Sequence, residues 1–474
     1  MKIKIKYFLI AIFLILFLFA FWQKRTNDEF RCTDCNVVFI VINALRYDHL
    51  SSAGYFRNTS KTIDNLDNTI FFENAYSNSP AIIGRMSLFT GLYPHNHKIL
   101  IKNTNSLEPN ISTMGQFFKL NGYRTVFFGP FDNDDMNLSA GFNRGFDELH
   151  NPGLNANSTV EWIENNSNQK FFIYFHTFVT HAPYFTYYNS DNKFSDNYSG
   201  NMIGSYDKLY RIMFQNITKM LAENPDEAYR IFGKENILNN IQLFTGNYSF
   251  DKVDAWDYIN ATDEGSYFRD GTFWNSTNLT DINDISHLEA MYDSRIVDAD
   301  LRVAKIIDAV NRMNLSSKTV IVITSDHGEE FMDHDQIDHN SLFDEIIHIP
   351  LVIKIPNTTA IKTDKIVQEV DILPTVLGIV GIKTSYVFDG HDILHGYDNQ
   401  YTFGEFYGWY RDLNNPVYNT SYVRTKEWKI LILPNGTREL FNIINDKHET
   451  KNLYYINSGI SNDLSTMLKK IENS

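Results

Sequence analysis

Residues 319–329 read Thr-Val-Ile-Val-Ile-Thr-Ser-Asp-His-Gly-Glu, an apolar, β-branched run that ends in a polar turn. A run of this kind is typical of a strand buried on both faces of a parallel sheet. The turn places a carboxylate, Asp326, next to an imidazole, His327, and both side chains are ligands for divalent cations. The stretch therefore predicts a buried strand with a metal site at its C-terminal end.

Similar apolar runs recur along the chain, and stretches with helical periodicity lie between them. Strands that alternate with helices predict an α/β fold, in which a large, mostly parallel sheet is flanked by helices. In such sheets ligands bind beyond the C-terminal ends of the strands, so we expect the chemistry there. The further runs span residues 36–42, 124–128, 171–175 and 349–355, and the helical stretches span residues 287–313 and 367–380.

Polar residues follow several of these runs directly. Asn43 comes immediately after the run at 36–42, and His176 and His181 come after the run at 171–175. Random placement would spread such residues over both edges of the sheet. Their position, together with that of Asp326, predicts one functional edge.

The composition restricts the class of protein. With 474 residues, of which 43% are hydrophobic, the chain can bury the core of one large domain and a smaller one. A net charge of -15 without a Lys/Arg-rich stretch excludes a nucleic-acid surface and favours small molecules or glycans as partners. Recurring Asn-x-Ser/Thr sequons would suit a glycosylated exterior, although an Asn-rich chain also produces them by chance. They include Asn58, Asn110, Asn137, Asn216, Asn247 and Asn278.

The N-terminus has the pattern of an export signal. Lysines at positions 2, 4 and 6 precede an apolar run over residues 7–22, and no small-x-small cleavage site follows. We therefore expect residues 1–26 to be an uncleaved signal-anchor, a single transmembrane helix with the main domain extracytoplasmic. Lys24 and Arg25 place positive charge on the other flank as well, so the charge bias for this orientation is weak.

A short linker, residues 27–35, carries the two cysteines of the chain, Cys32 and Cys35. A tetrahedral zinc site would need two further Cys or His ligands close by, and none is evident. A local disulfide outside the membrane and an unpaired linker both agree with the spacing, whereas a redox pair lacks a thioredoxin-like context.

Two regions follow the linker. Residues 36–397 are expected to form the main, catalytic-type domain, and residues 398–474, with an apolar run at 428–433, a small C-terminal α+β subdomain. Within the main domain, residues 185–286 are rich in Tyr, Phe and Asn and have weak periodicity. This stretch either walls the site, where its aromatic rings could stack on sugars, or forms a surface insertion with its own small core.

The order of short motifs along the chain resembles the sulfatase family of the alkaline phosphatase superfamily. Asp326-His327-Gly328-Glu329 is followed by His339 and then by a strand beginning Ile349-Pro350-Leu351. The resemblance covers nearly the whole exported chain. Further landmarks, in order, are residues 36–49, the signature helix at 85–94, and residues 122–129, 141–148, 181–184, 371–375 and 439–442.

The resemblance implies metal-dependent hydrolysis of sulfate or phosphate esters, here of envelope glycans or lipids. Sulfatases use a divalent cation, usually calcium, to activate a formylglycine made from Cys or Ser, whereas related transferases use a Thr and commonly zinc. Calcium is thus the expected cofactor, with zinc, manganese or magnesium as alternatives. The expected partner is a sulfated or phosphorylated small molecule, glycan or lipid. By resemblance, the metal ligands are Asn43, Asp326 and His327, and Arg85, His181 and His339 surround the transferred group.

The sequence departs from the family pattern at the positions of the nucleophile, of one metal ligand and of the sulfate-binding lysine. The nucleophile precedes the signature arginine by four residues, and that position holds Ala81, which has no nucleophilic group. Residues 82–84, Ile-Ile-Gly, replace the usual x-Pro-Ser. Asn43 stands at the first metal aspartate, and Pro130 stands at the lysine that binds the sulfate.

Three hypotheses remain open. The first is a working hydrolase or transferase, and the second is a pseudo-sulfatase that binds an anionic glycan or a membrane partner without turnover. The third is an anchor or scaffold without a ligand. A neighbouring hydroxyl at Ser77, Ser79 or Ser87 would sit ångströms away from the nucleophile position, and a displacement of even about 1 Å costs roughly a hundredfold in rate.

Overall fold

The computed structural model describes residues 30–100, 106–129, 140–150, 156–185, 193–194, 198–200, 202–239, 269, 271–407 and 420–473. The expected membrane anchor, residues 1–26, lies outside this part of the chain, as does Pro130. No helix within the described ranges combines the length and the apolar character that a membrane crossing requires.

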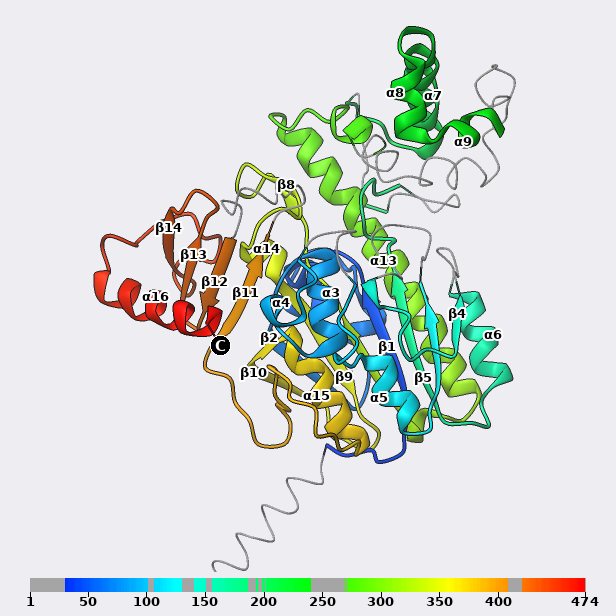
Figure 1. The fold of residues 1–474 in the computed structure, drawn as a ribbon, viewed down its shortest axis with the longest axis vertical. Coiled ribbons are helices and arrows are strands. Elements are labelled where there is room, and N and C mark those ends of the chain that lie inside the picture. The colour runs from blue at the N-terminus through cyan, green and yellow to red at the C-terminus, as the bar shows by residue number, and fades with distance from the viewer. Residues whose placement is uncertain are drawn as a thin grey trace, which may run out of the picture.

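A sheet of eight strands forms the centre of the molecule, in the order β10-β2-β9-β6-β1-β5-β3-β4 (Figure 1). β1 pairs in parallel with both β5 and β6, β3 pairs in parallel with β5 and β4, and β9 runs antiparallel to β6 and β2. The predicted α/β fold with a mostly parallel sheet is confirmed. The strands are β1 Asn36–Ile42, β2 Thr69–Tyr76, β3 Arg124–Phe128, β4 Glu148–His150, β5 Phe171–Thr177, β6 Thr319–Thr324, β9 His348–Lys354 and β10 Ile361–Gln368.

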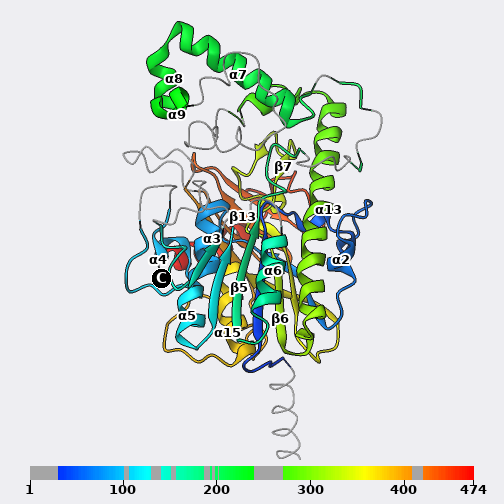
Figure 2. The ribbon, with the colours of Figure 1, turned by 90° about the vertical axis from the view of Figure 1, so that its right-hand side faces the viewer.

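Helices cover both faces of this sheet, and the two layers are visible in Figure 2. Alternate residues of β1 face opposite layers, because side chains along a strand point to opposite faces. Val37, Phe39 and Val41 pack with α3, α5 and α15, and Val38, Ile40 and Ile42 pack with α6 and α13. These helices are α3 Ala81–Thr90, α5 Met114–Leu120, α6 Asn157–Asn165, α13 Ile282–Arg312 and α15 Glu369–Val380.

A smaller antiparallel sheet, β11-β12-β13-β14, follows in the C-terminal part and carries helix α16 on one side (Figure 1). Three helices from the aromatic stretch at 185–286 lie beyond the edge of the main sheet at which β1 ends (Figures 1 and 2). The elements are β11 Thr402–Phe406, β12 Thr420–Arg424, β13 Trp428–Ile432, β14 Arg438–Asn442, α16 Ser458–Glu472, α7 Tyr206–Glu223, α8 Pro225–Phe232 and α9 Lys234–Asn239.

Short elements complete the described fold. They are η1 Tyr47–His49, η2 Ser51–Ala53, α2 Lys61–Asp64, α4 Pro94–His97, η5 Ser316–Lys318, β7 Glu330–Phe331, β8 Ile337–Asp338 and α14 Asp344–Ile347. β7 and β8 pair as an antiparallel hairpin directly after the turn at 325–329.

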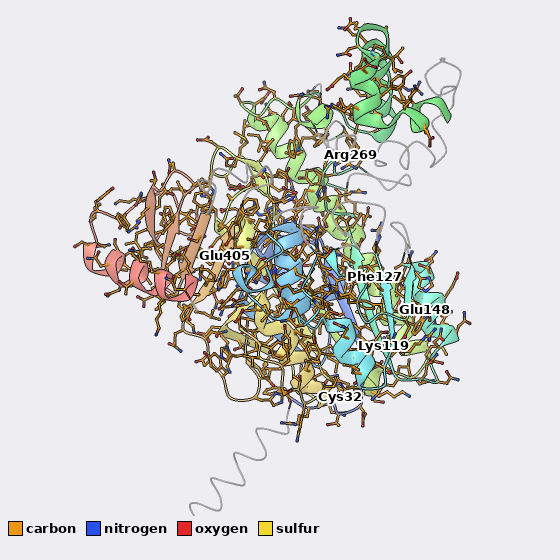
Figure 3. All side chains as sticks on the ribbon, viewed as in Figure 1. Cys32, Lys119, Phe127, Glu148, Arg269 and Glu405 are labelled. Carbon is orange, nitrogen blue, oxygen red and sulfur yellow. A yellow bond between two sulfur atoms is a disulfide. The ribbon has the colours of Figure 1, made fainter. Side chains whose placement is uncertain are left out.

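The two cysteines form a disulfide, Cys32–Cys35, immediately before β1. Cys32 lies at the end of the molecule where the strands β1 and β5 begin, opposite the edge at which they end (Figure 3). Its backbone N–H donates to the carbonyl of Ile379 in α15, at 2.8 Å, so the linker is tied to the core. Of the two readings of the Cys-x-x-Cys spacing, the structure has the disulfide.

Candidate functional site

The ends of β1 and β6 bring Asn43 and Asp326 together. The two strands are neighbours in parallel register, with Val41 opposite Thr324, so the residues after them meet at one edge. Asn43 Nδ2 donates to Asp326 Oδ2 at 2.8 Å, and the backbone N–H of Ala44 donates to Oδ1 at 3.2 Å. Ala44 adopts a left-handed conformation, with φ at 53°. Both carboxylate oxygens of Asp326 are thereby held by donors from the β1 turn.

Arg85 approaches the same carboxylate from helix α3. Its Nη1 donates to Asp326 Oδ2 at 3.2 Å, and both side chains are buried, at 1% and 0% exposed. Burial alone would raise the pKa of Asp326, but His327, Arg85 and His176 lower it to about 2. Asp326 is therefore an anion with its compensating cation beside it. Nε and Nη2 of Arg85 have no hydrogen-bond partner among the described residues.

Four histidines gather around this pair. The Nε2 atoms of His176 and His327 each lie 3.8 Å from Asp326 Oδ2. The ring of His327 stacks on that of His339, with centroids 4.2 Å apart, and His181 contacts His339 at 5.6 Å. His181 is partly exposed, whereas the others are buried. The six residues predicted for the site thus come together, and their individual roles stay predictions.

His327 is a neutral imidazole in this environment. Burial lowers its pKa to about 3, against the opposing effect of Asp326. Its Nδ1 lies 2.7 Å from the carbonyl oxygen of Gly328 and donates to it, which leaves Nε2 as an acceptor. Nε2 has no hydrogen-bond partner in the described part of the chain.

Ala81, which stands at the position predicted for the nucleophile, carries only a methyl group. Ala81 begins helix α3 in a left-handed conformation, with φ at 54°, and is buried. A Cβ on Gly84 would lie 1.8 Å from the carbonyl oxygen of Ser79, so no side chain fits there. The first turn of α3 therefore has no room for a serine side chain at position 84, where the motif has one.

Neighbouring hydroxyl groups are mostly engaged elsewhere. Ser77 Oγ donates to the backbone oxygen of Asp326 at 2.7 Å, and Ser87 Oγ lies 3.2 Å from His97 Nε2. Ser79 differs, since its buried Oγ has no hydrogen-bond partner within the described ranges.

Glu369, at the start of α15, is a member of the site that the sequence did not predict. It is 0% exposed, lies 3.0 Å from Ser77 Oγ through its Oε2, and accepts a hydrogen bond from the backbone N–H of Asn78 at 3.3 Å. Burial raises the pKa of Glu369 well above its ordinary value, against the opposing effect of Ser77 and Asn78. Only its proximity to the landmark at 371–375 could have drawn attention to it.

The sequence comparison identifies the family. The sulfatase family model matches residues 35–156 and 153–382, which is well over half of the chain. The chain belongs to the sulfatase family. Residues 332–474 also match the C-terminal region of N-sulphoglucosamine sulphohydrolase. The resemblance drawn from the motifs is therefore confirmed, and sulfatases as a family are hydrolases of sulfate esters.

Known relatives agree with this assignment. Arylsulfatase K of Bos taurus is 25% identical over 430 residues, which cover 85% of this chain and 75% of the relative. Arylsulfatase K of Homo sapiens is 23% identical over 404 residues, covering 81% and 72%.

Solved structures share the fold. A protein determined in complex with its substrate D-glucosamine-2-N,6-O-disulfate superimposes with a TM-score of 0.67 at 15% identity, covering 93% of this chain and 97% of the other. The phosphonate monoester hydrolase of Agrobacterium radiobacter has a TM-score of 0.65 at 18% identity, covering 93% and 95%.

Sulfatases generally use a divalent metal, typically calcium, and Asp326 is one of the ligands predicted for it in this chain. Calcium takes about six to eight oxygen ligands, with carboxylates prominent among them. Here Asp326 is the one carboxylate of the predicted set, and it already accepts from Asn43, Ala44 and Arg85. Asn43 Oδ1 is buried without a hydrogen-bond partner in the described chain, but the Arg85 guanidinium opposes a second cation. This donor set does not fit calcium.

Proposed function

We propose that this chain is a pseudo-sulfatase that binds the sulfate group of a sulfated glycan at Arg85 without hydrolysing the ester. The observation that carries this proposal is Ala81 at the nucleophile position of a site whose other members remain assembled. A methyl group can neither attack sulfur nor be matured to formylglycine. The close packing around Gly84 further supports the loss of the motif.

The groups around Ala81 suit an oxyanion. Helix α3 has ten residues, and its N-cap residue Pro80 supplies no side-chain hydrogen bond to the N–H groups of the first turn. A helix N-terminus favours negative charge through these N–H groups and through the helix dipole. Arg85 adds Nε and Nη2, which can donate in parallel to two sulfate oxygens.

The chemistry of a sulfated sugar matches the remaining side chains. His181 is the partly exposed member of the cluster and would meet a ligand first, while Nε2 of His327 can accept from a sugar hydroxyl. The related structure solved with a disulfated glucosamine supports a sulfated amino sugar as the ligand class. A phosphate ester offers similar oxygens, and the binding test includes it.

Residues 1–26 would hold this domain at a membrane, on its extracytoplasmic side. The disulfide between Cys32 and Cys35, next to the expected anchor, supports an oxidising compartment. Separation of membranes from soluble protein, followed by protease protection of the main domain, tests this placement. Release of the intact chain into the soluble fraction would contradict it.

Calorimetric titration of D-glucosamine-2-N,6-O-disulfate into the full chain tests the binding. We expect saturable binding, weakened by at least about tenfold in Arg85→Lys, because lysine keeps the charge but loses the fork of donors. Arg312→Lys is the matched control, since Arg312 pairs with Glu164 at an exposed position. Equal affinity of Arg85→Lys and the unaltered chain would contradict the proposal, as would release of inorganic sulfate.

A second candidate, hydrolysis of sulfate or phosphate esters, is favoured by the unpartnered hydroxyl of Ser79. Aryl sulfate and aryl phosphate, offered with calcium, magnesium, manganese or zinc, are the substrates to assay. Turnover that disappears in both Ser79→Ala and Asp326→Ala, and persists in Ser87→Ala, would establish this function in place of the first.

A further inference from the structure

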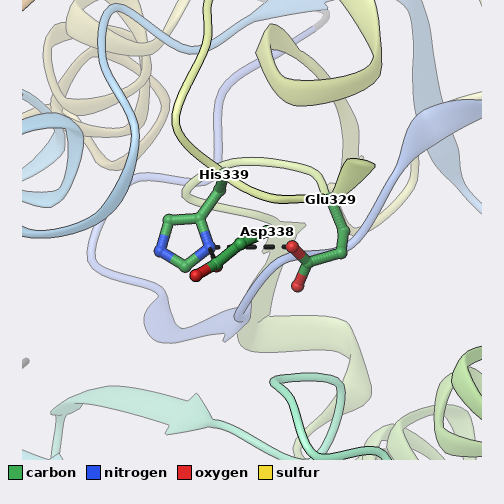
Figure 4. A group of neighbouring side chains, drawn as sticks. All are labelled: Glu329, Asp338 and His339. Atoms are coloured by element: carbon green, nitrogen blue, oxygen red, sulfur yellow. Dashed lines mark ion pairs between the residues drawn. The ribbon is translucent and has the colours of Figure 1, made fainter. Parts of the chain in front are cut away.

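A second cluster of ionisable side chains lies beside the Arg85–Asp326 pair, on the hairpin formed by β7 and β8. It consists of Glu329, Asp338 and His339, drawn in Figure 4. The hairpin pairs Glu330 with Asp338 in antiparallel register, so the flanking residues 329 and 339 face each other across it. The hairpin therefore places Glu329 and His339, while Asp338 adopts a left-handed conformation with φ at 70°.

The potential ligand atoms of these side chains all lie within 4.8 Å of one another. His339 Nδ1 is 3.7 Å from Glu329 Oε1 and forms a close ion pair with Asp338 Oδ1 (Figure 4). Glu329 and His339 are buried, and the side chain of Asp338 is 33% exposed. The cluster is thus compact and reaches solvent on one side.

Glu329 points to a missing partner. It is 0% exposed, and neither carboxylate oxygen has a hydrogen bond of normal length among the described residues, although Tyr184 and His339 lie near it. The distance of 3.7 Å to His339 is too long for a hydrogen bond. Buried polar groups are nearly always satisfied, and a carboxylate buried without donors is costly.

The contacts of His339 with Asp338 and Glu329 do not satisfy the Glu329 carboxylate. His339 Nδ1 faces both carboxylates, and a single imidazole nitrogen cannot hold both of them closely. Asp338 takes the close contact, and Glu329 is left with the longer one.

We propose that Glu329, Asp338 and His339 bind a Zn²⁺ ion. One imidazole and two carboxylates are a donor set typical of zinc, and the two negative charges balance the ion. On binding, His339 gives up its Nδ1 proton to solvent and coordinates through that nitrogen. Tetrahedral ligands at about 2.0–2.2 Å from zinc lie about 3.4 Å apart, so shifts of roughly 1 Å assemble the site.

This site differs from the cation position of the family, because Asp326 is not part of it. Asp326 is compensated by Arg85, whereas Glu329 has no arginine or lysine in ion-pair contact among the described residues and faces only His339, at 3.7 Å. The ring of His339 stacks on His327, so the ion would lie next to the histidines that surround Arg85. A fourth, open coordination position would take water. Zinc binding here does not depend on whether the neighbouring residues bind sulfate.

Dialysis of the full chain against Zn²⁺, followed by metal analysis, tests the site. We expect one zinc per chain, and a loss of affinity of at least about a hundredfold in Glu329→Gln, Asp338→Asn and His339→Ala, since ligand loss exceeds the effect of losing a supporting residue. Asp335→Asn is the matched control for Asp338→Asn, because Asp335 is an exposed carboxylate on the same hairpin. It should retain zinc.

Two further measurements keep the outcome decisive. Asp326→Asn should retain zinc, and zinc should raise the melting temperature of the unaltered chain but not that of Asp338→Asn. Absence of zinc binding by the unaltered chain would overturn the proposal. Retention of zinc by folded Glu329→Gln and Asp338→Asn would also overturn it, and so would loss of zinc in Asp326→Asn together with retention in Asp338→Asn.

Discussion

Two buried carboxylates, Asp326 and Glu329, stand on the same turn after β6 and differ in what surrounds them. Asp326 accepts hydrogen bonds from Asn43, Ala44 and Arg85, and its pKa is lowered to about 2. Glu329 has Tyr184 and His339 nearby but no hydrogen bond of normal length among the described residues, and burial raises its pKa. A carboxylate that is matched by an arginine of its own chain needs no metal, whereas we expect a carboxylate with only distant donors to be stabilised by an external cation.

Among the substitutions considered, removal of Arg85 should lower the free energy of unfolding most. Arg85→Leu leaves Asp326 buried without its cation, so we expect the free energy of unfolding to fall by about 3–5 kcal/mol. Urea denaturation measures the change. Arg312→Leu, at an exposed ion pair, should cost no more than about 1 kcal/mol. A similar small loss in Arg85→Leu would show that Asp326 is not compensated by Arg85.

Asp371 provides a second test, away from the site, of how the surroundings of a buried carboxylate set its pKa. It is buried and bonded only to neutral donors, including Asn399 Nδ2 at 2.6 Å, and burial raises its pKa to about 7. Its contribution to stability is therefore complete below pH 4 and is lost as the pH rises through about 7. We expect Asp371→Asn to remove up to about 4 kcal/mol of this pH dependence in denaturation curves. An unchanged pH profile would contradict the assignment.

The start of helix α3 provides a smaller effect. Gly84→Ser restores the motif residue but forces its Cβ against the Ser79 carbonyl, so we expect a loss of stability of about 1–3 kcal/mol. Gly459→Ser is the matched control, because nothing lies within 4 Å of the added atom there. Thermal or urea unfolding of both variants checks the difference. Equal stability of the two would mean that the helix start can still accommodate the motif.

The sequence predicted those parts of the fold that show continuous apolar runs. Strands β1, β3, β5, β6 and β9 are such runs, buried on both faces. Strands β2 and β10 were missed, because β2 carries Glu73 and Asn74, and the first half of β10 is polar and mostly exposed. Their pairing with each other joins residues far apart in the chain, which local periodicity does not report.

The candidate site divides in the same way. Asn43, Arg85, Asp326 and His327 belong to motifs that follow or begin buried elements, and motif order located them. Motif order could not locate Glu369, because its neighbour in the site, Ser77, is 292 residues away in the sequence. The contact between Arg85 and Asp326 was equally invisible, although it explains why the site suits calcium poorly.

One titration tests the central claim, which is that this site binds a sulfate ester and leaves it intact. D-glucosamine-2-N,6-O-disulfate added to the full chain can be followed by NMR, which reports binding and product together, in EGTA and then with calcium. We expect the same saturable binding in both conditions and an unchanged ligand after prolonged incubation. Binding that requires calcium, or the appearance of desulfated sugar, would contradict the account.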